Sequence, residues 1–448
     1  MNKYAFLTDQ YELTMLNAAL NDGRHETRSV FELFARKLPG DRRYGVVAGV
    51  GRALETVQDF RFDADDLKYL ADNKIVDSKT LKYLENYEFK GNITGLQEGD
   101  LYFPNTPLLQ VEGSFAECVV LETVLLSIYN YDSAIATAAS RMRNAAENRG
   151  LAEMGSRRAN ENAAVAAARA AYIAGFDSTS NVEAGRQYNI PTVGTSAHAF
   201  TLLYENELDA FRSQLASLGI NTTLLVDTYD TLRGIKYAVQ AAQEIAKSGE
   251  QLGSIRLDSG DLLSLAEKAR NLLDSLGSEQ TKIIVTNDLD EFSIAALQAK
   301  PIDSYGVGTS LVTGSGVPTC QMVYKMVARE GSDGSMIPVQ KLSASKKSVG
   351  GHKQVYRGFD AKNKINSEKI FVSENGFVHI HDTLQSQNLE NHTHTLMQNG
   401  TPNSEYISKQ GVINAKNRHK TELAKYPESI TRLSSGSAYI TPEFISVG

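Results

Sequence analysis

The feature that most constrains the fold is a regular alternation of short apolar runs and amphipathic helical patterns between residues 175 and 327. The apolar runs are rich in β-branched residues, and most end in a polar or glycine turn before the next helical pattern. We expect strands at residues 191–194, 222–226, 254–257, 282–285, 304–307 and 322–327. Between them, apolar residues recur at steps of three and four, as in residues 262–276. Repeated βα units predict a parallel sheet, open or closed into a barrel, with its ligand at the carboxyl ends of the strands.

The two ends of the chain show a different pattern. Residues 1–125 indicate an N-terminal α+β domain, with a helix near residues 9–20 and several short strands. Residues 126–340 hold the expected α/β barrel. Residues 341–448 return to short strands separated by Gly, Asn and Asp, and we expect this segment to pack with the N-terminal domain. The predicted fold class is α/β, an irregular barrel with an α+β domain built from both chain termini.

Composition narrows the possible partners. The 448 residues carry a net charge of −7, which does not favour a nucleic-acid-binding surface. Cys118 and Cys320 are the only cysteines, which argues against a disulfide scaffold and suits a reduced cytoplasm. The first residues lack the apolar core of a signal peptide, and the most apolar stretch, 118–128, is far shorter than the roughly 20 residues of a membrane span. We expect a cytoplasmic protein without a membrane or nucleic-acid partner.

The end of the strand at 254–257 is the first candidate site. Its polar and small residues are Arg256, Asp258, Ser259, Gly260 and Asp261, and a helix follows at once. Carboxylates accept hydrogen bonds from ribose hydroxyls, and a guanidinium is a forked donor for a carboxylate or phosphate. The N–H groups that begin the helix suit a phosphate. Arg256 alone could form a structural salt bridge, but this density of groups favours a sugar phosphate or nucleotide.

Two later strand ends carry further candidates. Gly306, Gly308 and Thr309 could offer backbone N–H groups to a phosphate, as the late strands of α/β barrels do, although a Gly-x-Gly pair can also serve only a turn. Asp288 follows another strand and could help to hold a metal-bound diphosphate. Equally, Asp288 could simply cap the next helix.

Histidines supply the remaining candidates. His198 follows the strand at 191–194, and Asp227 from the next strand could hold its second ring nitrogen and prepare a nucleophilic imidazole. Read alone, His198 could also be a structural histidine. His379, His381, His392 and His394 could in principle bind a metal. No carboxylate or cysteine pattern completes such a site, so we expect solvated strand residues.

Taken together, these motifs resemble those of the nicotinate phosphoribosyltransferases, a type II phosphoribosyltransferase family. The matching segments occur in the family's order and are residues 7–15, 31–34, 155–158, 194–198, 256–261, 306–309 and 353–357. The last ninety or so residues carry little of the resemblance.

The resemblance implies an activity. Nicotinate would attack phosphoribosyl pyrophosphate to give nicotinate mononucleotide and pyrophosphate, a step of NAD biosynthesis. Hydrolysis of ATP would be coupled to it through a phosphohistidine at His198. Magnesium suits the charge that develops on the departing diphosphate. The resemblance also implies a homodimer with a shared active site.

The same resemblance assigns roles to individual residues. Tyr11 would stack on the pyridine ring from a second subunit, Thr195 and Arg256 would contact nicotinate, and Thr309 would contact phosphoribosyl pyrophosphate. Arg157 lies in the Gly-Ser-Arg-Arg segment and is expected to bind substrate. Met154 stands where relatives commonly carry Phe, so we predict weaker nicotinate binding than in a Met154→Phe variant.

Three other functions remain open at this point. Nicotinamide phosphoribosyltransferase shares the fold and the histidine, although residues 194–198 and 9–11 fit the acid-specific enzymes better. A barrel aldolase or isomerase acting on sugar phosphates is a second possibility, but no Schiff-base lysine stands at a strand end. A ligand sensor without catalysis is the third.

Overall fold

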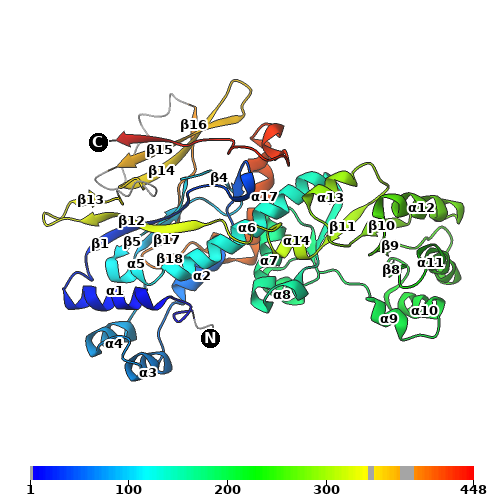
Figure 1. Ribbon diagram of the computed structural model, residues 1–448, viewed down its shortest axis with the longest axis horizontal. Helices are drawn as coiled ribbons and strands as arrows, with labels where there is room; N and C mark the ends of the chain where they lie inside the picture. Colours follow the sequence, from blue (N-terminus) through cyan, green and yellow to red (C-terminus); the bar gives the residue numbers. More distant parts are fainter. Residues whose placement is uncertain (1–3, 342–347, 374–387, 448) are drawn as a thin grey trace. The chain divides into compact units, whose positions relative to one another are not determined.

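The computed structural model describes residues 4–341, 348–373 and 388–447 and divides the chain into two compact units (Figure 1). Unit one comprises Met1–Thr137 and Val317–Gly448, and unit two comprises Ala138–Gly316. The long helix α6 (Glu122–Ala146) begins in unit one and ends in unit two. No helix among the described residues combines the length and the apolar character needed to cross a bilayer.

Unit one is built around an antiparallel sheet with seven described strands. In spatial order they are β13 (Met336–Pro338), β12 (Met322–Glu330), β1 (Arg28–Ala35), β5 (Pro107–Ser114), β3 (Asn92–Gly95), β17 (His394–Gln398) and β18 (Thr401–Pro402). A four-stranded sheet follows the order β16 (Leu389–Asn391), β14 (His352–Phe359), β15 (Ile365–Ser373) and β19 (Glu443–Val447). The two short strands β2 (Gly45–Val46) and β4 (Leu101–Tyr102) pair with each other.

Helices cover the sheets of unit one. They are α1 (Gln10–Asn21), α2 (Val50–Gln58), α3 (Ala64–Asp72), α4 (Ser78–Glu85), α5 (Phe115–Val119), α16 (Ser404–Ile407) and α17 (Lys409–Ala424), with 3₁₀ turns at Pro39–Asp41 and Glu428–Thr431. Helix α1 buries Leu13, Leu16 and Leu20, whose spacing of three and four places them on one helical face. These leucines join the main hydrophobic core of the unit.

Unit two contains the parallel sheet that the sequence predicts. Its six strands follow the order β7 (Ser178–Thr179), β6 (Gly150–Glu153), β11 (Ser304–Val307), β10 (Lys282–Val285), β9 (Ser254–Leu257) and β8 (Thr223–Leu225), and every pair is parallel. Strands β7 and β8 form its two edges and do not pair with each other, so the curled sheet is a half-barrel that does not close. Together with the α+β unit built from both termini, it confirms the predicted fold class.

The helices of unit two connect these strands. They are α7 (Glu161–Ile173), α8 (Val182–Tyr188), α9 (His198–Leu202), α10 (Glu207–Leu218), α11 (Thr231–Ile245), α12 (Leu262–Ser275), α13 (Glu291–Ala296) and α14 (Thr309–Val312), with a 3₁₀ turn at Ser156–Arg158. Helices α10, α11 and α12 follow one another around the outside of the strands (Figure 1). Helix α12 turns Ala266, Ala269 and Leu273 inward at steps of three and four, which confirms its predicted periodicity.

Four of the predicted strands in the repeated region are confirmed as β8, β9, β10 and β11. Two others are corrected. Residues 191–194 contribute only a single bridge, from Thr192 to Thr179, because Pro191 has no N–H to donate to a ladder. Residues 322–327 belong to β12, which pairs antiparallel with β1 in unit one and does not join the parallel sheet.

Candidate active site

Strand β9 places Arg256 on the inner face of the half-barrel. Ile255 and Leu257 on either side of it are fully buried, and successive side chains of a strand point to opposite faces. Nη1 of Arg256 lies 3.4 Å from the hydroxyl of Thr195, and its Nε is buried without a hydrogen-bond partner. Burial lowers the pKa of Arg256, although Asp258 and Asp227 nearby favour its charge. An anion that accepted from Nε would satisfy this guanidinium.

A cavity of about 370 Å³ lies on this face of the sheet. Its walls include four residues nominated from the sequence, namely Met154, Arg157, Thr195 and Arg256. Ser180 and Tyr305 also line it. The volume is within the usual range of small-molecule sites, and the wall is largely apolar with a few polar groups. The structure therefore brings these four predicted substrate-binding residues around one cavity.

His198 is the first residue of α9 and is held by two neighbouring strand ends. Its Nδ1 lies 3.1 Å from the hydroxyl of Thr228, which follows β8. Its Nε2 lies 3.7 Å from a carboxylate oxygen of Asp258, which follows β9. The side chain remains 41% exposed. The contact with Thr228 thus orients the ring through Nδ1, Asp258 lies near Nε2 beyond hydrogen-bond distance, and the ring remains open to a reactant.

The predicted partner of His198 is corrected by these contacts. Asp227 turns one carboxylate oxygen to the next strand end, where it accepts from the Asp258 N–H at 2.8 Å and the Ser259 hydroxyl at 2.7 Å. It therefore secures the turn that carries Asp258, and its link to His198 is indirect. Gly260 completes that turn with a φ of +81°, a value that favours glycine.

Three residues of the site escaped the sequence-based search. Thr286 follows β10 and donates its hydroxyl to Asp258, and Thr228 contacts His198. Glu153 is fully buried at the end of β6, where its carboxylate accepts from the Gly155 N–H and the Thr179 hydroxyl. Burial raises the pKa of Glu153. All three stand at strand ends, and that position was the signal available in the sequence.

The glycines after β11 are explained in part by close packing. A Cβ on Gly306 would stand 2.6 Å from Sδ of Met154 and 2.6 Å from Cγ2 of Thr286, so only glycine leaves room for both side chains. Gly308 precedes α14, and Thr309 at its first position is exposed. The phosphate role of Gly306, Gly308 and Thr309 stays a proposal.

Comparison with known proteins decides the family. Models of the nicotinate phosphoribosyltransferase N-terminal domain and of the nicotinate phosphoribosyltransferase family match residues 6–130 and 150–375. The chain belongs to the nicotinate phosphoribosyltransferase family. Nicotinate phosphoribosyltransferase pncB1 of Mycobacterium tuberculosis strain H37Rv is 56% identical over 372 residues, covering 81% of this chain and 80% of that protein. The Bacillus subtilis nicotinate phosphoribosyltransferase is 41% identical over 362 residues, covering 80% and 73%.

A solved structure agrees with the fold of this family. The crystal structure of human nicotinic acid phosphoribosyltransferase superposes with a TM-score of 0.82 at 24% identity, covering 97% of each chain. The second of the two family models ends at residue 375, so the last part of the chain is matched by neither.

Asp261 and Asp288, both nominated from the sequence, have different structural roles. Asp261 caps α12 by accepting from the Leu263 N–H at 3.2 Å. Asp288 is exposed with a φ of +45°, and Asp290 forms the capping box of α13. The alternative that Asp288 caps this helix is therefore wrong, and its metal role remains a proposal.

The described residues contain one group of three potential metal ligands, and it lies in unit one. Asp100, His392 and Glu422 are buried, with ligand atoms within 4.8 Å of one another. The guanidinium of Arg357 lies 3.3 Å from Nδ1 of His392 and 3.9 Å from Glu422, and it donates to Glu368. Arg357 supplies positive charge to this buried cluster, which fits a structural ion network.

The histidine prediction is thereby corrected for one residue. His392 is buried rather than solvated, because it packs beside Arg357 and Asp100. His394 begins β17 and is partly buried, and burial lowers its pKa. His379 and His381 lie outside the described residues.

Unit one presents Tyr11 and a second cavity. Tyr11 on α1 is 46% exposed, and burial of its remaining surface, together with nearby acids, raises its pKa to about 12.

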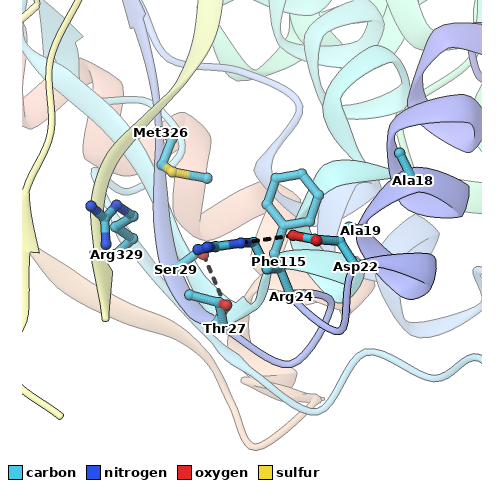
Figure 2. A pocket seen from close by; sticks show the side chains of 9 residues that line it. All are labelled: Ala18, Ala19, Asp22, Arg24, Thr27, Ser29, Phe115, Met326 and Arg329. Atoms are coloured by element: carbon cyan, nitrogen blue, oxygen red, sulfur yellow. Dashed lines mark hydrogen bonds and ion pairs between the residues drawn. The ribbon is translucent and has the colours of Figure 1, made fainter. Parts of the chain in front are cut away.

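The second cavity, of about 350 Å³, lies among α1, β1, α5 and β12 (Figure 2). Phe115 and Met326 form apolar walls, while Arg24 is engaged by Asp22 at 2.8 Å. None of the residues nominated from the sequence lines this cavity.

Proposed function

We propose that the chain is an ATP-coupled nicotinate phosphoribosyltransferase of NAD biosynthesis. Its products would be nicotinate mononucleotide and pyrophosphate. The observation that carries the proposal is the cavity lined by Arg256, Thr195, Met154 and Arg157, next to the strand ends that contact His198. Family membership supports the same reaction.

The choice of nicotinate over nicotinamide rests on charge. Arg256 keeps a buried Nε–H without a partner, and a carboxylate is the acceptor that best matches a guanidinium. Met154 would lie against the ring, where its thioether gives polarizable contact. A neutral amide would leave the charge of Arg256 less well compensated.

The reaction needs little proton transfer. The pyridine nitrogen attacks the anomeric carbon with a free lone pair, the bond to the diphosphate breaks, and the diphosphate leaves with the electron pair. The site must therefore stabilise positive charge on the ribose and negative charge on the leaving group. We expect Asp258, Ser259 and Asp261 to contact the ribose, and Gly306, Gly308 and Thr309 to contact the phosphates.

The carboxylates at these strand ends fit Mg²⁺ as donors. Asp258 and Asp288 follow neighbouring parallel strands, and Mg²⁺ prefers oxygen ligands and commonly takes one or two carboxylates plus substrate phosphates. When bound, Mg²⁺ would neutralise the charge of the departing diphosphate. Asp288 would supply a ligand from its exposed position.

His198 would be the residue that ATP phosphorylates. Its ring contacts Thr228 through Nδ1, has Asp258 near Nε2, and remains accessible. The nucleophilic ring nitrogen would form a bond to the γ-phosphorus while ADP leaves. The added charge of about −1.5 to −2 would then change the affinity of the site for substrate and product.

We also propose a homodimer in the cytoplasm, without nucleic-acid or membrane partners. The exposure of Tyr11 on α1 is compatible with stacking on a pyridine in a partner subunit. The net charge of −7 supports the absence of a nucleic-acid partner.

A side-by-side assay tests the function. The purified protein is incubated with phosphoribosyl pyrophosphate and labelled nicotinate or labelled nicotinamide, with and without ATP. We expect nicotinate mononucleotide as the main product, with a higher yield when ATP is present. Preferential conversion of nicotinamide would establish the rival enzyme, and the absence of any mononucleotide would reject transferase activity.

A further inference from the structure

Glu207 is a buried acid to which neither the fold nor the proposed reaction gives a role. It is the first residue of α10 and only 3% exposed. Both of its carboxylate oxygens are buried without a hydrogen-bond partner. An ionised carboxylate in such surroundings is costly unless a proton or a cation compensates it.

Asp227 offers the same kind of unpaired oxygen. One of its oxygens is committed to the turn after β9, whereas Oδ1 is buried without a partner. The whole residue is 8% exposed. Glu207 and Asp227 together therefore present three buried carboxylate oxygens without hydrogen-bond partners.

The register of α10 against β8 brings the two acids to the same edge of the sheet. Nε2 of Gln214 donates to the carbonyl of Thr223 at 2.9 Å. From this anchor, the helix rises by about 10 Å to Glu207 at 1.5 Å per residue. The chain after Thr223 rises by about 13 Å to Asp227 at about 3.3 Å per residue. The two carboxylates thus reach similar heights at the carboxyl end of β8.

Electrostatics agrees with this placement. Burial is the main cause that raises the pKa of Glu207 to about 7; Arg233 opposes this shift, while Asp227 and Asp230 add to it. Arg233 is exposed, and no hydrogen bond or ion pair of its side chain is present among residues 138–316, all of which the structure describes. The exposed guanidinium of Arg233 therefore leaves both carboxylate oxygens of Glu207 without a hydrogen-bond partner.

We propose that Glu207 and Asp227 form a binding site for a divalent cation of the Mg²⁺ type, with the other ligand positions filled by water or phosphate oxygens. A hard cation with oxygen ligands would satisfy all three orphan oxygens at once. Thr228, the neighbour of Asp227, contacts Nδ1 of His198. A phosphoryl group at His198 would therefore lie close to the cation, a consequence that rests on the proposed function, whereas cation binding itself does not.

Binding of Mn²⁺ to the protein without nucleotide or phosphoribosyl pyrophosphate tests the site. Mn²⁺ serves as a paramagnetic probe for Mg²⁺, and free Mn²⁺ is followed by electron paramagnetic resonance. We expect Glu207→Gln to weaken binding of one Mn²⁺ at least tenfold. The matched control is Glu205→Gln, an exposed acid two residues earlier, which should leave that affinity within twofold of wild type. Equal affinity of Glu207→Gln and wild type would overturn the site.

Thermal unfolding gives a second readout. Mg²⁺ should raise the Tm of wild type and of Glu205→Gln, but not that of Glu207→Gln, because a ligand stabilises only the state that binds it. Asp227→Asn, which keeps an acceptor for Ser259, should also lose the Mg²⁺ effect. A full Mg²⁺ effect in both variants would contradict the proposal. Wild-type protein that makes the mononucleotide but binds no Mn²⁺ would reject the cation site alone, and wild-type protein that binds Mn²⁺ but makes no mononucleotide would reject the proposed function alone.

Discussion

At the scale of single residues, the orientation of His198 depends on a hydroxyl and a carboxylate. Thr228 contacts Nδ1 at 3.1 Å, and Asp258 approaches Nε2 at 3.7 Å. Asp258 is in turn held by Thr286 and by the turn that Asp227 secures. The orientation of the His198 ring therefore depends on residues from three neighbouring strand ends.

Replacing Thr228 tests its positioning role. Thr228→Val keeps the shape and removes the hydroxyl, so we expect phosphorylation of His198 by ATP to slow by roughly five- to tenfold, equivalent to about 1 to 1.5 kcal/mol. Thr228→Ser should restore most of the rate. The measurement is the rate of labelled phosphate incorporation from ATP. Equal rates in the Val and Ser variants would show that the hydroxyl does not position the ring.

Gly306 makes a second prediction at this scale. In Gly306→Ala the new Cβ would collide with Met154 and with Thr286, and overpacking of this kind costs about 1 to 3 kcal/mol. We expect a lower Tm and a KM for nicotinate raised about tenfold, because Met154 must move. A steady-state assay and a melting curve measure the two effects. An unchanged KM would mean that Met154 does not contact the substrate.

At the scale of elements, the sequence predicts the parallel strands well because each is short, apolar and followed by a turn. β9, β10 and β11 lie at the expected residues. The side-chain contacts at their ends are less predictable. Asp227 could reach either His198 or the turn after β9, and only the spacing of the strands decides that it reaches the turn.

Helix α12 allows a test at this scale, because Asp261 caps it. Asp261→Ala should lower the free energy of unfolding by about 1 kcal/mol, whereas Asp261→Asn should keep the cap and the stability. Urea unfolding of both variants measures this. The KM for phosphoribosyl pyrophosphate reports separately on a contact to ribose. A loss of stability in the Asn variant as large as that in the Ala variant would contradict the capping role.

At the scale of the whole molecule, unit one contains both ends of the chain. The contacts between these two ends cannot be predicted from local sequence patterns. β12 resembles the barrel strands in sequence but pairs with β1, nearly 300 residues earlier. Lys353 forms a buried ion pair with Glu32, and His419 on α17 lies 3.0 Å from the carbonyl of Gly99. Such pairings arise from tertiary packing and escape a reading of propensity and periodicity.

The buried His419 makes the free energy of unfolding sensitive to acid. Burial lowers the pKa of His419 from 6.5 to about 4, so the unfolded chain takes up a proton first as the pH falls. Stability from this group is complete above pH 6.5 and is lost as the pH falls toward 4, by about 2 kcal/mol at pH 5. His419→Gln should remove that part of the pH dependence. Urea unfolding at pH 7 and pH 5 measures it, and identical pH dependence in both proteins would refute it.

The coupling of ATP to the transferase through His198 is the central claim, and a mass measurement on His198 tests it most directly. The protein is incubated with ATP, digested under neutral conditions, and the peptide containing His198 is weighed before and after addition of phosphoribosyl pyrophosphate and nicotinate. We predict one phosphate on His198 with ATP alone and its loss when both substrates are added. No phosphate on His198, or full ATP stimulation in a His198→Ala variant, would contradict the account.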